Sequence, residues 1–392
     1  MLNREAAMPY KKLLAAQLVR PAEGGIKRHV LTLLDGFDRE RIESVVICPP
    51  NTSLYEEVEK AGYEVVPLDL VGELNPAKDL KAAIALRRIL RDIRPDVLHI
   101  HSTKAALIGR TASLGIRNLR VLVSVHSFVF DERVGCVKRA IVGWVERRLA
   151  RRAERIIVVS GALKKELVSR MRLPEDKIEV VYNGIAPVSG QPCPETTTTT
   201  TATDTATERH SGMRIGTVSR LAPQKGVDVL LRSAALLVDD FPKLEVVIVG
   251  DGPLRGDLEE LARELGISDR VKFLGFRSDA LSIVAGLDVF VLSSTRETFG
   301  MTLAEAMSLG VPVVASRTGG IPEVVDDEHT GLLAEPGNPC DFASKVRALA
   351  SDKDLARTMA ERGRTVVRDR FGSAAMVSSI EKLYFGEANA GR

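Results

Sequence analysis

Two carboxylates eight residues apart mark the segment of this chain best suited to chemistry. Glu297 and Glu305 enclose the sequence Thr-Phe-Gly-Met-Thr-Leu-Ala, and an apolar strand predicted over residues 288–292 leads into it. We expect Glu297 on the loop that leaves this strand, a helix that begins with Thr-Phe-Gly, and Glu305 inside that helix. The first N–H groups of a helix lack intrahelical partners and can bind an anion. One carboxylate could hold sugar hydroxyls, the N–H groups a diphosphate and the other carboxylate a ribose, so the pattern indicates a nucleotide-sugar site.

Two cations follow a second predicted strand. Arg220 and Lys225 come directly after the strand expected over residues 214–219, before the next helix. An arginine can clamp phosphate oxygens with its fork of donors, and a lysine adds a point charge. Taken alone the pair is typical of a solvated surface. Because carboxyl ends of parallel strands meet at one edge of a sheet, both cations are expected near residues 297–305, which favours phosphate binding.

Glycines at two predicted strand-to-helix turns could let a ligand approach the backbone. They are Gly24-Gly25 in the first half and Gly250-Asp-Gly-Pro in the second. A glycine turn that opens a helix is suited to phosphate but is also common without a ligand. Neither is the GxGxxG pattern of a dinucleotide site.

Histidines gather at the ends of predicted strands. His126 ends the strand predicted over residues 121–126, where it could exchange a proton or bind a hydroxyl-rich ligand, or have a structural role. His99 and His101 share one face of another strand, but no acidic third ligand is evident and structural roles are favoured over a metal. The Asp-Lys-Asp of residues 352–354 is expected on a solvated surface. The prediction is therefore no metal site.

The elements that must position these residues alternate between strands and helices, which is typical of parallel α/β domains. Right-handed crossovers then give two doubly wound sheets that bind ligands beyond their strand carboxyl ends. Between the two halves, a Thr-rich stretch without apolar periodicity predicts a flexible linker. The predicted strands cover residues 12–19, 44–48, 64–68, 97–101, 121–126, 155–160, 178–182, 214–219, 244–250, 271–274, 289–292 and 311–315.

Composition indicates an ordinary globular protein of two domains. The 392 residues are 45% hydrophobic and 27% charged, and the four scattered cysteines predict a reducing, cytoplasmic environment. We expect no signal peptide and no membrane-spanning segment. Residues 1–187 carry 32 Lys and Arg against 23 Asp and Glu, and the remainder 23 against 29. Two basic amphipathic stretches, 79–94 and 137–153, could touch anionic lipid or merely pack on their own sheet.

Together these motifs closely resemble glycosyltransferase family 4, the retaining enzymes of GT-B fold, over essentially the whole chain. The matching pieces are Gly24-Gly25, His126, Val158–Ser160 with Lys164, Val181–Ile185, Gly216–Leu221, Lys225-Gly226, Val249–Pro253, Phe273–Phe276, Glu297–Glu305, Gly310–Ala315 and Gly319–Glu323. The resemblance implies two Rossmann-like domains that face each other across a cleft. An acceptor-side domain would span residues 1–187, the linker 188–211 and a nucleotide-sugar-binding domain 212–372, while 373–392 would cross back to the first domain.

The resemblance also implies roles for individual residues. The catalytic set would be His126 near the sugar and acceptor, Arg220 and Lys225 on the leaving diphosphate, and Glu297 on the transferred sugar. Glu305 would bind the ribose. The donor-binding residues would be Gly25, Gly250, Phe276, Arg277, Phe299, Gly300, Met301, Thr302, Leu303 and Glu305. A UDP- or GDP-sugar would be a substrate, and no cofactor or metal is expected.

The expected activity is retaining, metal-independent hexosyl transfer from a nucleotide sugar to a lipid-linked or oligosaccharide acceptor, in the synthesis of cell-surface polysaccharide or glycolipid. The protein would be cytoplasmic, with peripheral contact to an anionic inner membrane surface left open, and would not bind nucleic acid. Departing phosphate would assist acceptor deprotonation on the front face. Alternatives on the same fold are a nucleotide-sugar epimerase, a phosphorylase and a non-catalytic binding module. Ser127 follows His126 where the family commonly has glycine.

Overall fold

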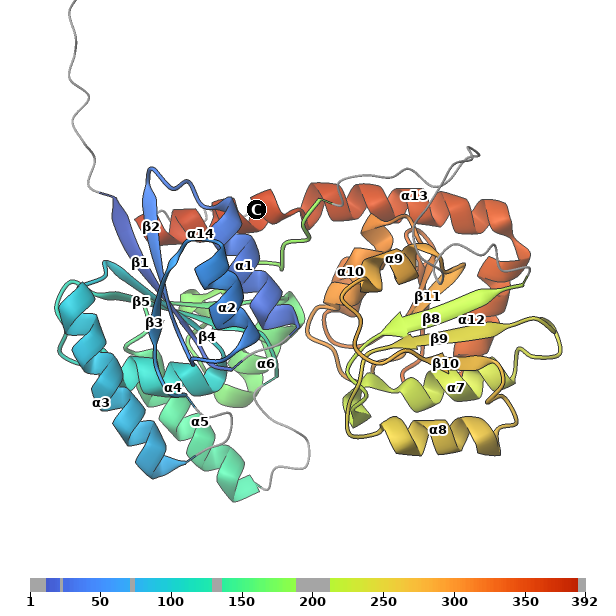
Figure 1. Cartoon of the computed structure of the whole chain (residues 1–392), viewed down its shortest axis with the longest axis horizontal. Helices are drawn as coiled ribbons and strands as arrows, with labels where there is room; N and C mark the ends of the chain where they lie inside the picture. The colour runs from blue at the N-terminus through green and yellow to red at the C-terminus, as the bar shows by residue number, and fades with distance from the viewer. Residues whose placement is uncertain (1–11, 22–23, 71–74, 129–135, 188–211, 387–392) are drawn as a thin grey trace, which may run out of the picture. The chain divides into compact units, whose positions relative to one another are not determined.

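The computed structural model describes residues 12–21, 24–70, 75–128, 136–187 and 212–386, with the backbone alone for 136–142. These residues form two compact units (Figure 1). The first holds the described residues up to Gly184 together with those from Ser373, and the second runs from Ile185 to Gly372. Each unit has a parallel sheet with helices on its faces, which confirms the predicted fold class of two doubly wound, Rossmann-like domains.

The first unit is built on a seven-stranded sheet of order β3-β2-β1-β4-β5-β6-β7, in which every pairing is parallel. Its strands are short apolar runs, and β4 is buried along its whole length because helices cover both faces. The order reverses between β1 and β4, so ligands are expected there. The strands are β1 Leu13–Val19, β2 Ile42–Cys48, β3 Glu64–Pro67, β4 Val97–His101, β5 Arg120–Val125, β6 Arg155–Val158 and β7 Ile178–Val180.

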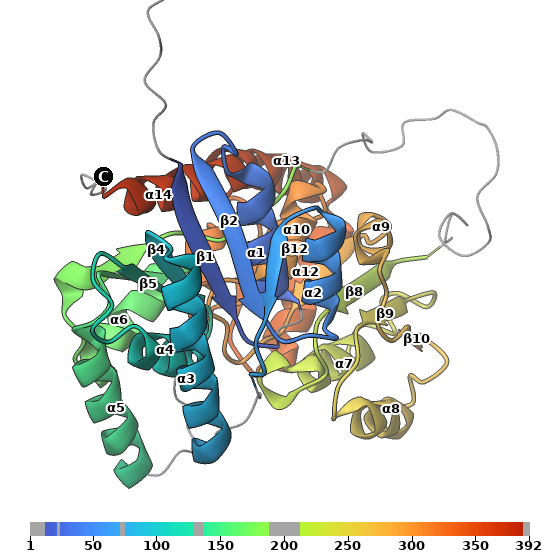
Figure 2. The same ribbon diagram turned by 60° about the vertical axis from the view of Figure 1, so that its left-hand side comes forward.

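The helices of the first unit include one from the far end of the chain, α14. It packs beside α1 on the sheet, where Met376 and Ile380 of α14 share an apolar cluster with Leu33 of α1 and with Phe37, which directly follows α1. On the other side, α3 and α5 flank α4 in both ribbon views (Figures 1 and 2). The helices are α1 Gly25–Gly36, α2 Ser53–Lys60, α3 Pro76–Ile93, α4 Thr103–Ala112, α5 Cys136–Ala150, α6 Gly161–Met171 and α14 Ser373–Phe385.

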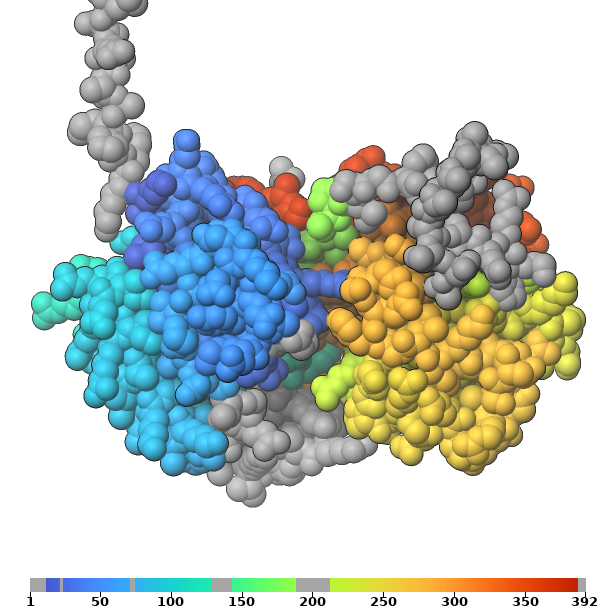
Figure 3. Space-filling view, in the orientation of Figure 1, coloured from blue at the N-terminus to red at the C-terminus, as the bar shows by residue number. Residues whose placement is uncertain are grey.

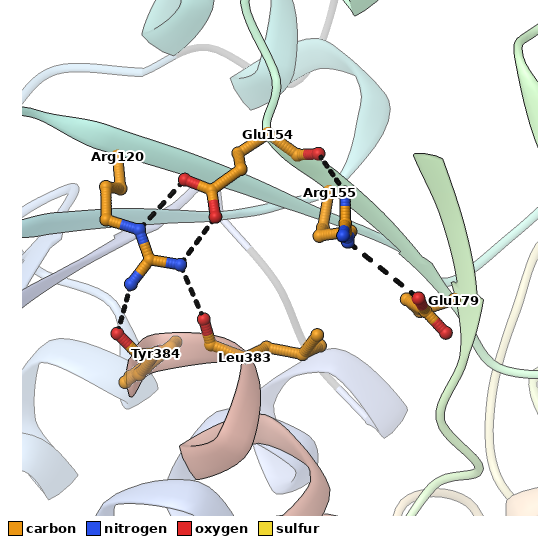
Figure 4. A network of polar contacts seen from close by, with 6 residues as sticks. All are labelled: Arg120, Glu154, Arg155, Glu179, Leu383 and Tyr384. Atoms are coloured by element: carbon orange, nitrogen blue, oxygen red, sulfur yellow. Dashed lines mark hydrogen bonds and ion pairs between the residues drawn. The ribbon is translucent and has the colours of Figure 1, made fainter. Parts of the chain in front are cut away.

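Arg120 fastens the end of α14 to the sheet (Figure 4). Its guanidinium donates to the carbonyl oxygens of Leu383, at 2.8 Å, and of Tyr384. The same group donates to both carboxylate oxygens of Glu154, at 2.8 and 2.5 Å. The last carbonyls of a helix have no intrahelical partner, so this arginine satisfies groups that would otherwise need water.

The second unit has a six-stranded parallel sheet of order β10-β9-β8-β11-β12-β13. Strand β13 was absent from the prediction, because three apolar residues are too short for a recognisable pattern. A large cluster with Leu230, Ile248 and Phe342 forms the core beneath α7 and α12. The strands are β8 Arg214–Val218, β9 Glu245–Val249, β10 Val271–Phe273, β11 Val289–Leu292, β12 Val313–Ser316 and β13 Leu332–Ala334. The helices are α7 Val227–Ala235, α8 Arg255–Glu264, α9 Ala280–Ala285, α10 Met301–Ser308, α11 Ile321–Val324, α12 Pro339–Ser351 and α13 Lys353–Arg370.

In the part of the chain that the structure describes, no helix combines the length and the apolar character needed to cross a bilayer.

Candidate functional site

The segment between the two carboxylates is a loop followed by the start of α10. Glu297 lies on the loop that leaves β11, and Glu305 lies inside α10, as predicted. The helix begins at Met301, so the expectation that Thr-Phe-Gly opens it was wrong. Gly300 has a φ of 90°, a left-handed conformation that the chain needs in order to turn into the helix. The first-turn N–H groups therefore belong to Met301 and the two residues after it.

Glu297 is in direct contact with Lys225. The Lys225 Nζ lies 2.5 Å from Glu297 Oε2, although the residues are 72 positions apart. The Glu297 side chain is 13% exposed and that of Lys225 24%. Glu297 Oε1 also accepts the N–H of Thr298 at 3.2 Å, and its main-chain carbonyl accepts the N–H of Gly320 at 3.0 Å. The carboxylate is thus held in one place by its own loop and by the loop after β8.

Those two loops are fastened to each other through their backbones. Gly226 has a φ of 59°, and a Cβ built on it would lie 2.1 Å from the carbonyl oxygen of Ser293. Ser293 Oγ donates to the carbonyl of Gly226 at 2.7 Å, and the Thr295 N–H donates to that of Gln224 at 3.0 Å. No larger residue fits at position 226, and the close approach is what brings Lys225 to Glu297.

Arg220 and Gly250 lie on the neighbouring loops of the same edge. Arg220 is exposed just after β8. Gly250, directly after β9, has a φ of 123°, and a Cβ there would meet the Ser219 carbonyl oxygen at 2.0 Å. The N–H of Leu221 donates to the Asp251 carbonyl at 3.0 Å, which joins the two loops. Gly250 thus has a packing reason to be glycine, and its contact with a ligand stays a prediction.

The remaining donor-binding candidates separate into exposed and buried side chains. Phe276, after β10, is 84% exposed, and Arg277 beside it donates to both Asp279 oxygens at 2.7 and 2.6 Å. Phe299 and Leu303 are buried, so only their main-chain groups could face a ligand. Thr302 and Glu305 are partly exposed on α10.

The candidates of the second unit thus follow four strands that are adjacent in its sheet, β10, β9, β8 and β11. The loop after β8 brings cations, the loop after β11 a carboxylate, and the start of α10 brings N–H groups. Such an edge can hold an anion and a polyhydroxyl group next to each other.

In the first unit, Gly25 and His126 are linked through a histidine that sequence reasoning overlooked. Gly25 is the first residue of α1, and His29 lies one turn further along, buried. The rings of His29 and His126 lie 4.6 Å apart, centroid to centroid. His29 lies in a helix of ordinary amphipathic pattern, so only its place over β4 and β5 reveals its neighbours.

His29 belongs to a cluster of four histidines with His99, His101 and His126. Ring centroids of His99 and His101 lie 4.2 Å apart, and His101 Nδ1 lies 3.4 Å from His126 Nε2. One ring nitrogen each from His29, His101 and His126 lies within 4.8 Å of the other two. The sequence disfavoured a metal because no acidic third ligand is evident; the structure instead adds a third imidazole, that of His29, beside His101 and His126.

Amide oxygens set the tautomers of two of these rings. His29 Nδ1 lies 3.0 Å from Asn183 Oδ1, and His101 Nε2 lies 3.0 Å from Gln17 Oε1. An amide oxygen only accepts, so each of these nitrogens carries the proton and the other ring nitrogen has a lone pair. His99 contacts the Tyr384 hydroxyl and Ser124 Oγ, both at 2.7 Å.

Burial keeps the cluster neutral. It lowers the pKa of His29 to about 4, which the Asn183 hydrogen bond only partly offsets. The pKa values of His99, His101 and His126 lie well below 6.5 because the rings are buried and neighbouring imidazolium charges repel each other. At neutral pH, His126 is therefore an uncharged imidazole.

Both units match models of known protein families. The model described as Glycosyltransferase Family 4 matches residues 23–188, and the one described as Glycosyl transferases group 1 matches residues 206–366. UDP-Gal:alpha-D-GlcNAc-diphosphoundecaprenol alpha-1,3-galactosyltransferase of Escherichia coli is 26% identical over 381 residues, which cover 95% of this chain and 96% of that enzyme. N-acetyl-alpha-D-glucosaminyl L-malate synthase of Bacillus anthracis is 36% identical over 168 residues, 43% of this chain and 44% of that enzyme.

Solved structures share the fold. That of Anabaena HepE in complex with UDP-glucose superposes with a TM-score of 0.79 at 21% identity, over 95% of this chain and all of that one. At this identity the likeness is one of fold.

Proposed function

This chain belongs to glycosyltransferase family 4, and we propose that it transfers a hexose from a nucleoside-diphosphate sugar to a lipid-linked or oligosaccharide acceptor, with retention of configuration and without a catalytic metal. The observation that carries this proposal is the contact between Lys225 and Glu297 beside the start of α10. This contact holds a cation and a carboxylate next to each other at the carboxyl edge of one sheet, where the cation would face a leaving phosphate and the carboxylate a sugar.

The cations and the helix start would stabilise the leaving group. Cleavage of the anomeric C–O bond builds negative charge on the diphosphate, and groups already aimed at that charge lower the barrier. Lys225 and Arg220 supply positive charge, and the N–H groups of Met301, Thr302 and Leu303 supply dipoles. Because Lys225 is already held by Glu297, its ammonium needs little reorganisation when a donor binds.

The carboxylates would hold the two sugar rings of the donor. Glu297 would accept hydrogen bonds from hydroxyls of the transferred sugar, with the backbone of Phe299 and Gly300 alongside. Glu305, a turn into α10, would bind the ribose. Phe276 is the most exposed large apolar side chain among the described residues, and its ring could stack on the base beside Arg277.

His126 would act as a neutral group near the transferred sugar and the acceptor, and Gly25 would bring the N-terminus of α1 to the phosphate. Departing phosphate would take the acceptor proton on the front face, so that no covalent sugar–enzyme bond forms. Trapping of a glycosyl-enzyme by a fluorinated donor and its detection by mass spectrometry would contradict this route.

The acceptor class is supported by the name of the Escherichia coli relative, whose acceptor is a diphosphoundecaprenol-linked sugar. A lipid-linked acceptor calls for contact with a membrane, and we infer that α3 makes it; the surface of this helix lies at the lower left of Figure 3. Its Leu80 and Ile84 are 61% and 47% exposed beside the exposed cations Lys81 and Arg88. On α5, Trp144 is 57% exposed. We propose that these side chains contact anionic lipid on the cytoplasmic face of the membrane.

The test is transfer of labelled sugar from a panel of UDP- and GDP-sugars to a membrane extract, with EDTA present and absent. We expect one donor to label a lipid fraction at least as strongly with EDTA as without it, with the anomeric configuration of the donor kept in the product. Epimerised donor without acceptor would instead indicate an epimerase, and binding without turnover a non-catalytic module. Binding to vesicles that depends on anionic lipid and weakens with salt tests the membrane contact.

A further inference from the structure

We propose that His29, His101 and His126 form a binding site for one divalent transition-metal ion of the kind that prefers imidazole, such as Zn²⁺. Three histidines of the first unit converge there: one from α1, one from β4 and one directly after β5. Three imidazoles with an open fourth position are an established ligand set for zinc.

The nitrogens that would bind the ion are set by the partners of the opposite ring atoms. The Nδ1–H of His29 donates a hydrogen bond to Asn183 Oδ1, so His29 Nε2 has its lone pair available. Among the described residues this buried Nε2 has no hydrogen-bond partner. The Nε2–H of His101 donates a hydrogen bond to Gln17 Oε1, so the lone pair is on His101 Nδ1, which lies 3.4 Å from His126 Nε2.

The spacing suits a metal ion better than it suits hydrogen bonding. With Zn–N bonds of about 2.0–2.1 Å, tetrahedral ligand atoms lie about 3.4 Å apart. One pair already has this separation, and one ring nitrogen of each of the three histidines lies within 4.8 Å of the other two. Modest rotation of the rings would bring the other nitrogen–nitrogen distances to that of a tetrahedral site. A bound cation would also give the buried His29 Nε2 the partner that it lacks among the described residues.

The outer contacts are those of a metal site as well. Ligating histidines generally donate their other ring N–H to a carbonyl or carboxylate, which fixes the ring and strengthens the ligand. Asn183 does this for His29 and Gln17 for His101. Gln17 is itself held by a 2.8 Å hydrogen bond from its Nε2 to the Tyr384 hydroxyl.

An ion at this site would coordinate His126 through Nε2 and occupy the lone pair of that nitrogen. This consequence rests on the proposed function, in which His126 lies near the sugar and the acceptor. Metal binding would then inhibit transfer, and a chelator would restore it. The site would thus couple activity to the concentration of a metal that the reaction itself does not need.

The experiment uses the full chain without a histidine tag, freed of metal, titrated with Co²⁺ and followed by its d–d absorption. We expect one equivalent to give the intense visible bands of a four- or five-coordinate ion, and Zn²⁺ to displace it. His29→Asn keeps an amide N–H for Asn183 while it removes the Nε2 ligand, and should abolish the bands. Asn183→Ala should weaken Zn²⁺ binding by about 10–100-fold.

His329→Asn, at an exposed histidine of the second unit, is the matched control and should bind Co²⁺ like the wild type. Circular dichroism and thermal melting establish that each variant is folded, and His126→Asn provides a second ligand deletion at a less buried position. Absence of the bands in the wild type, or their persistence in folded His29→Asn and His126→Asn, would overturn the proposal. Metal binding without inhibition would keep the site and refute the role of His126 in transfer.

Discussion

Replacing Lys225 by methionine removes the ammonium group that touches Glu297 while it keeps most of the side-chain length. In the wild type, Lys225 Nζ lies 2.5 Å from Glu297 Oε2. The variant leaves the carboxylate, 13% exposed, with the Thr298 N–H as its remaining close donor and Ser294 Oγ at 3.5 Å. Two effects follow, one on stability and one on the reaction, and they differ in size.

The loss of stability should be moderate. Removing one hydrogen bond to a charged group costs about 1.5–3 kcal/mol, and the partly exposed setting keeps the loss near the middle of that range. For a unit of this length, about 2 kcal/mol lowers the Tm by roughly 4–8 °C. The protein therefore stays folded at 25 °C, where turnover is measured.

The loss of activity should be much larger. Deletion of one donor that stabilises a developing oxyanion lowers kcat by about 10²–10³, or about 2.7–4 kcal/mol. We expect Lys225→Met to lose turnover by that factor, measured as release of nucleoside diphosphate at saturating donor and as labelled product.

The control is Lys272→Met, which also breaks a Lys–Glu pair of the second unit. Lys272 Nζ lies 2.9 Å from Oε1 of Glu245, a residue at the amino end of β9, away from the loops of the site. Arg214 remains on Glu245 at 3.2 Å, so this variant should melt slightly lower and keep kcat within twofold. If Lys225→Met lowers the Tm as calculated yet keeps kcat within threefold of the wild type, the reasoning that places Lys225 on the leaving group is refuted.

Three further results are expected. Glu297→Gln should weaken binding of the nucleotide sugar more than binding of the free nucleoside diphosphate in calorimetry, because only the former presents sugar hydroxyls; equal losses would contradict a sugar contact. The hydrogen bond from Arg120 lowers the pKa of Glu154 below 4.5, so the pair's contribution is fully present above pH 4.5 and is lost as the pH falls through that lowered value. In urea denaturation, the free energy of unfolding of the wild type should therefore exceed that of Glu154→Gln by at most about 1 kcal/mol at pH 7 and by less at pH 3. A difference that is larger at pH 3 than at pH 7 would contradict this pH dependence. Burial raises the pKa of the Cys48 thiol to about 12, whereas Cys340 is exposed, so iodoacetamide at pH 8 should alkylate Cys340 first in native protein, as read by peptide mass spectrometry; equal rates would show that Cys48 is accessible.

Much of the second unit could be predicted because its chemistry is carried by residues that directly follow strands. A short apolar run predicts the strand, and the next few residues must then lie at the carboxyl edge of a parallel sheet. Arg220, Lys225 and Glu297 satisfy this condition. The start of α10 was predicted too early. Gly300 adopts a left-handed conformation that a helix does not contain, so the loop continues to Gly300 and the helix begins only at Met301.

The histidine cluster could be predicted from the sequence only in part. His126 follows a strand, His101 ends one and His99 shares its face, so all three could be recognised as candidates. His29 is one apolar-face residue of an ordinary amphipathic helix, and nothing in its neighbours along the chain distinguishes it. Its significance depends on α1 lying over β4 and β5, close to residues about 72 and 97 positions away.

The sequence by itself determined two doubly wound parallel sheets and the edge at which the motifs lie, because hydrophobic periodicity and turn residues act over a few positions. Only the tertiary structure decided which motifs touch. The loops after β8 and β11 meet because the strand order reverses there, and this brings Lys225 to Glu297. The same reversal between β1 and β4 brings the start of α1 to the strand ends that carry His101 and His126. Strand order depends on the packing of a whole unit, which no local pattern encodes.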